Sequence, residues 1–143
     1  MYDDILISLS PRHVNKILDG TKTVELRRRR IAVRPGTRVW IYSKVPRGQV
    51  EALGIVKEVI ERHPCRIWQD YRHTIGISLE EFYEYFRDRE LGHAIVFQKI
   101  LLLRPALSLN TLRKQVLGFH PPQFFKRLAA DGPELSLFCS AIS

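Results

Sequence analysis

The apolar residues of this chain occur in short runs that alternate with period two, and turn-forming residues separate the runs. Ile5, Ile7 and Leu9 share one face of an expected opening strand. Residues 38–43 are rich in β-branched and aromatic side chains, which predicts another strand. Runs this short favour a small sheet or barrel over long helices or a membrane span. The remaining expected strands cover 22–33, 50–60 with a bulge at Gly54, and 91–103.

Helix signals fall between and after these strands. Ser10-Pro11 combines a good N-cap with a proline suited to the first helical position, which predicts a helix over 11–19. Ser78 and Glu81 have the spacing of a capping box before an apolar face that holds Leu79, Phe82, Tyr83 and Phe86. Short helices are also expected over 64–71, 110–116 and 123–128, and residues 133–143 fit either a strand or a loose tail.

Together these patterns predict an α+β fold. We expect a small mixed or antiparallel β-barrel whose openings are covered by short helices. The chain of 143 residues carries no repeat and no linker, so one domain over 1–143 is expected. Its barrel core would cover about 4–104 and a C-terminal helical extension about 105–143.

The N-terminal sequence and the two cysteines indicate where in the cell the protein is expected. The N-terminus Met1-Tyr2 leads into no basic segment followed by a long apolar run, so neither a secretory signal nor a membrane span is expected. Cys65 and Cys139 are far apart in the sequence and form no Cys-x-x-Cys motif. We therefore expect buried free thiols in the reducing cytosol and a cytoplasmic protein.

The charge is strongly positive and unevenly distributed. The net charge is +8, and residues 1–50 contribute 11 Lys and Arg against 4 Asp and Glu. A positive field of this kind attracts polyanions such as RNA, and it also attracts acidic proteins. A basic protein that is merely soluble has the same composition, so charge alone does not identify the partner.

The most distinctive feature is a charged cluster where the first helix gives way to a strand. Strand alternation places Thr23, Glu25 and Arg27 on one face, with Lys22 at the start of the strand. A carboxylate between two cations holds them in place, and such a cluster can bind a phosphate or a base edge. The alternative is a ladder of surface ion pairs, each contributing about 1 kcal/mol at most.

The pattern Gly20-x-Lys22-x-x-Glu25-x-Arg27 resembles the signature of the ASCH domain, a family of the PUA-like superfamily. Several other blocks occur in the order found in one prokaryotic branch of that family, and together they span most of the chain. The resemblance implies a β-barrel whose cleft is lined by Lys22, Glu25 and Arg27, and a role in binding RNA. The blocks are Ser8-x-Ser10-Pro11, Arg28-Arg29, Tyr42-Ser43-x-x-Pro46, Gly76-Ile77-Ser78, Ala94-Ile95 and Pro121-Pro122-Gln123.

The chain departs from very small bacterial members that resemble this motif. Those proteins hydrolyse N4-acylated cytidine with a lysine, a threonine and an acid. The threonine would fall at position 25, which is Glu25 here, and the stretch 71–77 that would supply the acid has no carboxylate. Asp70 is the nearest acid. A lysine nucleophile must be neutral, and Glu25 opposes the lowering of its pKa.

Further residues are expected to complete the cleft. Arg29 would follow Arg27 on the same strand face, and Lys44 would lie at the end of strand 38–43. Some nearby residues also have a purely structural interpretation. Ser10 suits a helix cap, and Trp40 and Tyr42 suit a buried core. The histidines show no metal-ligand spacing, and neither a metal nor another cofactor is expected. The full set of expected binding residues is Lys22, Glu25, Arg27, Arg29, Ser10, Arg12, Tyr42, Ser43 and Lys44.

Three functional hypotheses follow. The first is a module that binds RNA or a nucleotide-like molecule in a basic cleft. The second is a hydrolase acting on modified nucleosides or RNA, with Lys22 and Glu25 as its catalytic pair. The third is a protein-interaction domain in transcription regulation, whose basic face meets an acidic partner. The oligomeric state cannot be predicted from these patterns.

Overall fold

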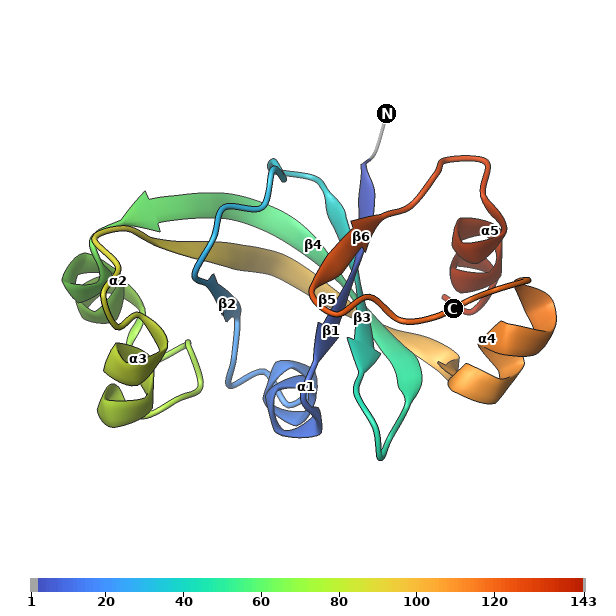
Figure 1. Cartoon of the computed structure of the whole chain (residues 1–143), viewed down its shortest axis with the longest axis horizontal. Coiled ribbons are helices and arrows are strands. Elements are labelled where there is room, and N and C mark those ends of the chain that lie inside the picture. Colours follow the sequence, from blue (N-terminus) through green and yellow to red (C-terminus); the bar gives the residue numbers. More distant parts are fainter. Residues whose placement is uncertain (1–2, 143) are drawn as a thin grey trace.

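The computed structural model describes residues 3–142, and the strands within that range form one continuous sheet (Figure 1). The first half of the chain supplies most of the sheet, and the second half supplies its longest strand and most of the helices. In chain order the elements are β1 (Asp4–Leu9), α1 (Pro11–Leu18), β2 (Val24–Arg27), β3 (Arg38–Ser43), β4 (Gln49–Arg62), α2 (Pro64–Tyr71), α3 (Leu79–Tyr85), β5 (Gly92–Ser108), α4 (Leu109–Gln115), β6 (Phe125–Arg127) and α5 (Pro133–Ser140).

The sheet is mixed and strongly curved, as the expected α+β barrel requires. Within residues 3–142 it has six strands in the order β2-β5-β4-β3-β1-β6. β1 and β3 are parallel, and the other neighbouring pairs are antiparallel. The long β4 and β5 form a ribbon, with α2 and α3 at one end and α4 and α5 at the other (Figure 1). β2 is therefore an edge strand close to both α1 and α3.

Three apolar clusters hold these elements together. α2 and α3 cover one end of the sheet with Ile67, Phe82 and Phe86, which pack around Val24 and Leu26 of β2. α1 packs against the middle of the sheet in a second cluster. α4 and α5 cover the other end in a third. β2 is held by the first of these clusters, so its opposite face is directed away from the core.

Several expected boundaries are confirmed. The helix over 64–71 and the strand over 38–43 have the predicted bounds, and the helix expected at 11–19 ends one residue earlier. Ser78 accepts a hydrogen bond from the Glu81 backbone, as predicted for a cap. The Glu81 carboxylate, however, turns to Arg12 rather than closing the capping box. Leu79 is exposed, so the predicted apolar face of α3 is only partly buried.

The strand expected over 22–33 is much shorter than predicted. β2 ends at Arg27, opposite His93, because β5, the one strand of residues 3–142 that pairs with it, begins at Gly92. Without a partner, residues 28–30 leave the sheet and are exposed to solvent. Arg27 and Arg29 therefore do not continue along one strand face as the alternation predicted.

The long strand over 50–60 is confirmed, but its expected bulge at Gly54 is wrong. Gly54 is paired with Val39 and Ile100, and the register shifts lie on either side of it. A Cβ at position 54 would lie 2.7 Å from the ring of Phe97. Glycine is needed here because an aromatic ring lies directly on the backbone.

The C-terminal third also differs from expectation. Residues 123–128 were expected to be helical, but Phe125–Arg127 form β6, antiparallel to β1. The free edge of β1 offers unpaired backbone groups, and pairing with them outweighs local helix propensity. Residues Pro133–Ser140 form a helix, not a strand or a tail. Phe124 and Phe125 of this segment are substantially exposed.

The two cysteines and the ends of the chain were also the subject of sequence-based expectations. Cys65 and Cys139 are free, but both are exposed, so their expected burial is wrong. Along residues 3–142 no helix has the length and apolar character needed to cross a membrane. The expectation of no secretory signal involves Met1 and Tyr2, which lie outside the described residues, as does Ser143 of the stretch 133–143.

Candidate functional site

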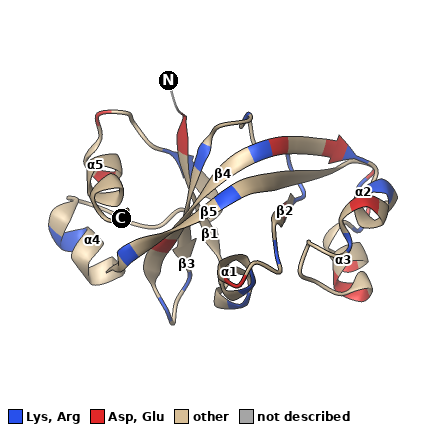
Figure 2. Cartoon of the chain, turned by 180° about the vertical axis from the view of Figure 1, so that it is seen from behind, with Lys and Arg blue, Asp and Glu red and all other residues tan. Residues whose placement is uncertain are grey.

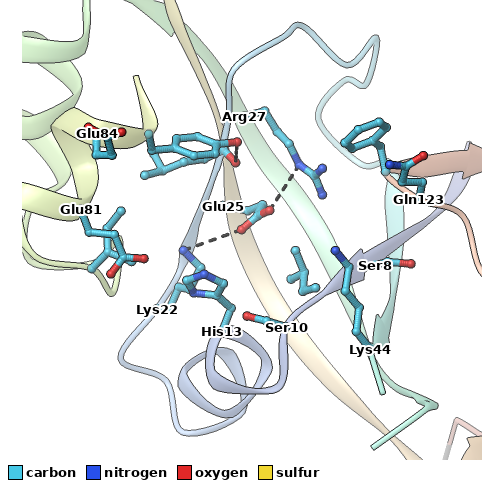
Figure 3. Close-up of a pocket in the computed structure, with 15 residues that line it drawn as sticks. Ser8, Ser10, His13, Lys22, Glu25, Arg27, Lys44, Glu81, Glu84 and Gln123 are labelled. Carbon is cyan, nitrogen blue, oxygen red and sulfur yellow. Dashed lines mark hydrogen bonds and ion pairs between the residues drawn. The ribbon is translucent and has the colours of Figure 1, made fainter. Parts of the chain in front are cut away.

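The site begins at the junction of β1 and α1. Ser10 has the extended backbone of an N-cap and precedes Pro11 in the first turn of α1. In the described part of the chain its side chain makes no capping hydrogen bond, and its Oγ is buried without a partner. The side chain lines a cavity instead (Figure 3). The predicted cap position is therefore confirmed, but the hydroxyl remains available to a ligand.

β2 brings the charged cluster into the same cavity. Alternation buries Val24 and Leu26 in the core and directs Glu25 and Arg27 to the opposite face, as predicted. Glu25 Oε1 lies 3.7 Å from Lys22 Nζ, and its Oε2 lies 3.3 Å from Arg27 Nε (Figure 3). One carboxylate thus holds two cations beside a single cavity.

Lys22 is almost fully buried, with 2% of its surface exposed. Its Nζ donates a 2.6 Å hydrogen bond to the backbone carbonyl of Ile75. Gly76, at φ 74°, allows this loop to approach, because a Cβ there would lie 3.2 Å from Lys22 Cβ. Burial lowers the pKa of the Lys22 ammonium, and the opposing effect of the Glu25 charge is smaller.

His13 of α1 joins this cluster, although it is not among the expected binding residues. It lines the cavity, and its Nδ1 is buried without a hydrogen-bond partner among residues 3–142. Burial lowers the pKa of His13, and the nearby charge of Lys22 lowers it further. Its imidazole is therefore held neutral more firmly than that of an exposed histidine, and a neutral imidazole can accept a proton.

α3 forms one wall. Glu81, Glu84 and Tyr85 line the cavity from this helix. The Tyr85 hydroxyl donates to the Leu26 carbonyl at 3.1 Å, and burial raises the pKa of Tyr85. Glu81 pairs with Arg12 of α1, so the two helices are tied together.

The opposite wall comes from β1 and the segment before β6. Ser8 Oγ donates a 2.6 Å hydrogen bond to the Pro122 carbonyl, and the Ser8 amide donates to the Phe124 carbonyl at 3.3 Å. These bonds hold Gln123 and Phe124 at the cavity, and Lys44, the residue after β3, lines the cavity as well. Figure 3 shows Gln123, Ser8 and Lys44 on this side of the cavity.

The resulting cavity has a volume of about 500 Å³, within the range of small-molecule sites. It is open to solvent and combines cations, carboxylates, a neutral imidazole and apolar side chains. No group of three His, Cys, Asp or Glu side chains between residues 3 and 142 is arranged to hold a metal ion. An anion or a polar organic molecule fits this set of groups better than an apolar one.

Comparison with known proteins identifies the family of the chain. Residues 5–112 match the family described as "Domain of unknown function (DUF365)". The chain belongs to this family. This DUF365 chain is also similar to a Zymomonas mobilis protein named "ASCH domain-containing ribonuclease", with 28% identity over 120 residues, covering 84% of this chain and 80% of that protein.

The fold comparison places the DUF365 chain among ASCH domains. The crystal structure of the ASCH protein from Zymomonas mobilis superposes with a TM-score of 0.88 at 26% identity, covering 98% of this chain and 96% of that one. A variant of that protein with one serine replaced by alanine gives the same values. The resemblance inferred from the sequence and the expected α+β barrel of PUA-like type are both confirmed.

Only some of the predicted binding residues lie together in the DUF365 chain. Ser10, Lys22, Glu25, Arg27 and Lys44 line the one cavity. The other predicted residues do not line this cavity. Arg12 lies in the exposed ion pair with Glu81, and Arg29 is exposed beyond the end of β2. Ser43 is buried, and Tyr42 is buried in the core with Trp40.

Several lining residues of this DUF365 chain carry no distinctive sequence signal. His13 lies one helical turn from Ser10, so its proximity could have been inferred once the helix was assigned. Gln123 and Phe124 reach the site only because β6 pairs with β1, about 115 residues earlier in the sequence. The Ile75 carbonyl is a backbone group, which no side-chain motif can indicate.

Proposed function

We propose that this protein binds single-stranded RNA, with one nucleotide held in the cavity between β2, α1 and the segment before β6. The observation that carries the proposal is Arg27. Its guanidinium is held by Glu25 at one edge, while its Nη2 is buried without a hydrogen-bond partner in the described chain. A guanidinium presented in this way suits a phosphate oxygen.

Two other unpartnered polar atoms support a polar ligand. Ser10 Oγ and His13 Nδ1 are buried, lack partners within residues 3–142, and belong to side chains lining the same cavity as Arg27. A buried polar group without a hydrogen bond costs about 1–3 kcal/mol. A ligand that bonds to all three would recover part of that free energy, which an apolar ligand could not do.

The charge of the chain and its relatives favour RNA over a small anion. A net charge of +8 attracts a polyanion over long range. The Zymomonas mobilis relative is named a ribonuclease, so a protein with the same fold is associated with RNA.

The proposal is tested by measuring the affinity for a short single-stranded RNA between about 50 and 200 mM salt. Arg27→Ala should weaken binding about tenfold or more at the lower salt, because a charged hydrogen bond is lost. The matched control is Arg66→Ala, which removes the same charge from an exposed position on α2 outside the cavity. Equal losses in both variants, or no binding by the unaltered protein, would refute the proposal.

A second candidate, cleavage of the bound RNA, is favoured by the presence of both His13 and Lys22 at the same cavity. His13 would accept the proton of a ribose 2′-hydroxyl as its oxygen attacks phosphorus. The Lys22 ammonium, made more acidic by burial, would donate a proton to the departing 5′-oxygen, while Arg27 stabilises the charge on phosphorus. The new 2′-O–P bond replaces the broken P–O5′ bond, leaving a 2′,3′-cyclic phosphate and a 5′-hydroxyl.

This candidate is tested by incubating RNA with the protein and identifying the ends by mass spectrometry. Lys22→Ala and His13→Ala should each reduce cleavage about 100-fold, the scale of one general acid or base. N4-acylated cytidine, assayed in parallel, tests the alternative in which neutral Lys22 attacks an amide. Cleavage that persists unchanged in Lys22→Ala would exclude Lys22 from either mechanism.

A further inference from the structure

The wall formed by Gln123 and Phe124 lies beyond residues 5–112, the part of the chain that matches the family. Phe124 is 64% exposed although it is a large apolar side chain. It belongs to none of the three apolar clusters formed by the described residues. The ring therefore contributes little to the core, and its position at the cavity needs another explanation.

The backbone around Phe124 is firmly held. The two hydrogen bonds from Ser8 fix the Pro122 and Phe124 carbonyls, and Phe125 pairs with Ile7 in the sheet. A ring presented from a fixed backbone loses little conformational entropy when it binds a flat ligand. This is the arrangement of a stacking platform.

Charge decides which end of a nucleotide faces this wall. In the view of Figure 3, Arg27 and Lys44 lie between Gln123 and the α3 carboxylates of Glu81 and Glu84. A phosphate is repelled by the carboxylates and attracted by the two cations. With its phosphate near Arg27 and Lys44, a nucleotide directs its base toward either α3 or the opposite wall, and only the opposite wall offers an exposed ring with an adjacent amide.

We infer that Phe124 and Gln123 form a nucleobase-binding subsite at the mouth of the cavity. The base stacks on the Phe124 ring, and the Gln123 side-chain amide, which carries both a donor and an acceptor, bonds to its edge. The inference rests on the proposed RNA binding and names the part of the ligand that this wall takes. Phe124 supplies affinity that is similar for all bases, and Gln123 supplies preference among them.

The test compares an RNA oligonucleotide of one base with an abasic oligonucleotide of the same length and phosphate number. Phe124→Ala should weaken binding of the base-bearing strand by about 5- to 150-fold, the range found for stacking of one base. It should leave the abasic strand bound as before. Phe124→Tyr should restore affinity, because the ring is kept. Gln123→Ala should change the ranking among oligo-A, oligo-C and oligo-U.

The matched control is Phe125→Ala, the same substitution one residue further along at a position that does not line the cavity. If the unaltered protein binds base-bearing and abasic strands equally, the subsite is refuted while phosphate binding stands. Unchanged affinity in Phe124→Ala refutes it as well, and so does an equal loss in Phe125→Ala. If neither strand is bound by the unaltered protein, the proposed function itself fails.

Discussion

At the scale of single residues, Glu25 organises the site. With 6% of its surface exposed, it lies between Lys22 and Arg27 and contacts both. Burial alone would favour neutral Lys22, and the Glu25 carboxylate opposes this by favouring the ammonium. A single side chain thus influences both the protonation of Lys22 and the orientation of Arg27.

We expect Glu25→Gln to destabilise the protein at pH 7 by about 1–3 kcal/mol, the cost of leaving a buried polar partner unsatisfied. The pKa of Lys22 should fall further. The pKa of Lys22 is lower in the folded protein than in the unfolded chain. As the pH rises, Lys22 therefore loses its charge in the folded protein before it does so in the unfolded chain. The stability difference between the variant and the unaltered protein should therefore shrink at alkaline pH.

Thermal unfolding at pH 7 and at alkaline pH measures this effect. Glu84→Gln is the matched control, because Glu84 lines the same cavity but its carboxylate forms an exposed ion pair with Arg87. Its unfolding midpoint should not change measurably. A destabilisation by Glu25→Gln that stays constant with pH would argue against electrostatic coupling to Lys22.

At the scale of elements, the C-terminal segment completes the fold as well as the cavity. α5 inserts Phe138, which has no exposed surface, with its ring centroid 5.4 Å from that of Trp40. The Trp40 Nε1 in turn donates to Asp4 Oδ2 at 2.8 Å. α5 is therefore bound to the β1–β3 pair, from which the β1 wall of the cavity also arises.

We expect Phe138→Ala to reduce the free energy of unfolding by about 3–5 kcal/mol, the usual cost of removing a buried phenylalanine side chain. Denaturant unfolding measures it. Phe124→Ala makes the same chemical change at an exposed ring and should leave stability nearly unaltered. Similar losses in the two variants would mean that the two rings do not differ in their contribution to the core.

At the scale of the whole molecule, charge is widely spread, with Lys and Arg on α1, α2, α4 and the long strands (Figure 2). The cations that line the cavity, Lys22, Arg27 and Lys44, nevertheless all come from the first fifty residues, where the positive surplus lies. For single-stranded RNA the logarithm of affinity should fall with the logarithm of salt by about 0.7 per neutralised phosphate. The slope therefore counts the phosphates that the whole protein neutralises.

Other expectations stay predictions at this scale. These are a single domain over 1–143, a cytoplasmic location, and an acidic protein partner in transcription regulation. Capture of an acidic protein that survives nuclease treatment would favour the last over RNA binding.

The sequence by itself determined what depends on neighbours within a few residues. Alternation in β2 directs Glu25 and Arg27 away from Val24 and Leu26, and Ser10-Pro11 starts α1, because strand and helix periodicity are local properties. The motif that joins Gly20 to Arg27 is local for the same reason. Together with the other sequence blocks it indicated the ASCH family, and it supplied three charged residues that line the cavity, Lys22, Glu25 and Arg27.

Only the tertiary structure decided which distant residues complete the cavity. Residues 123–128 form β6 because the edge of β1 is free, and that pairing carries Gln123 and Phe124 to the site. Arg29 does not reach the site because β5 begins at Gly92, next to the partner of Arg27, and offers no residue to pair with position 29. These outcomes depend on which backbone groups remain unpaired when distant segments meet, and residue preferences over a short window do not contain that information.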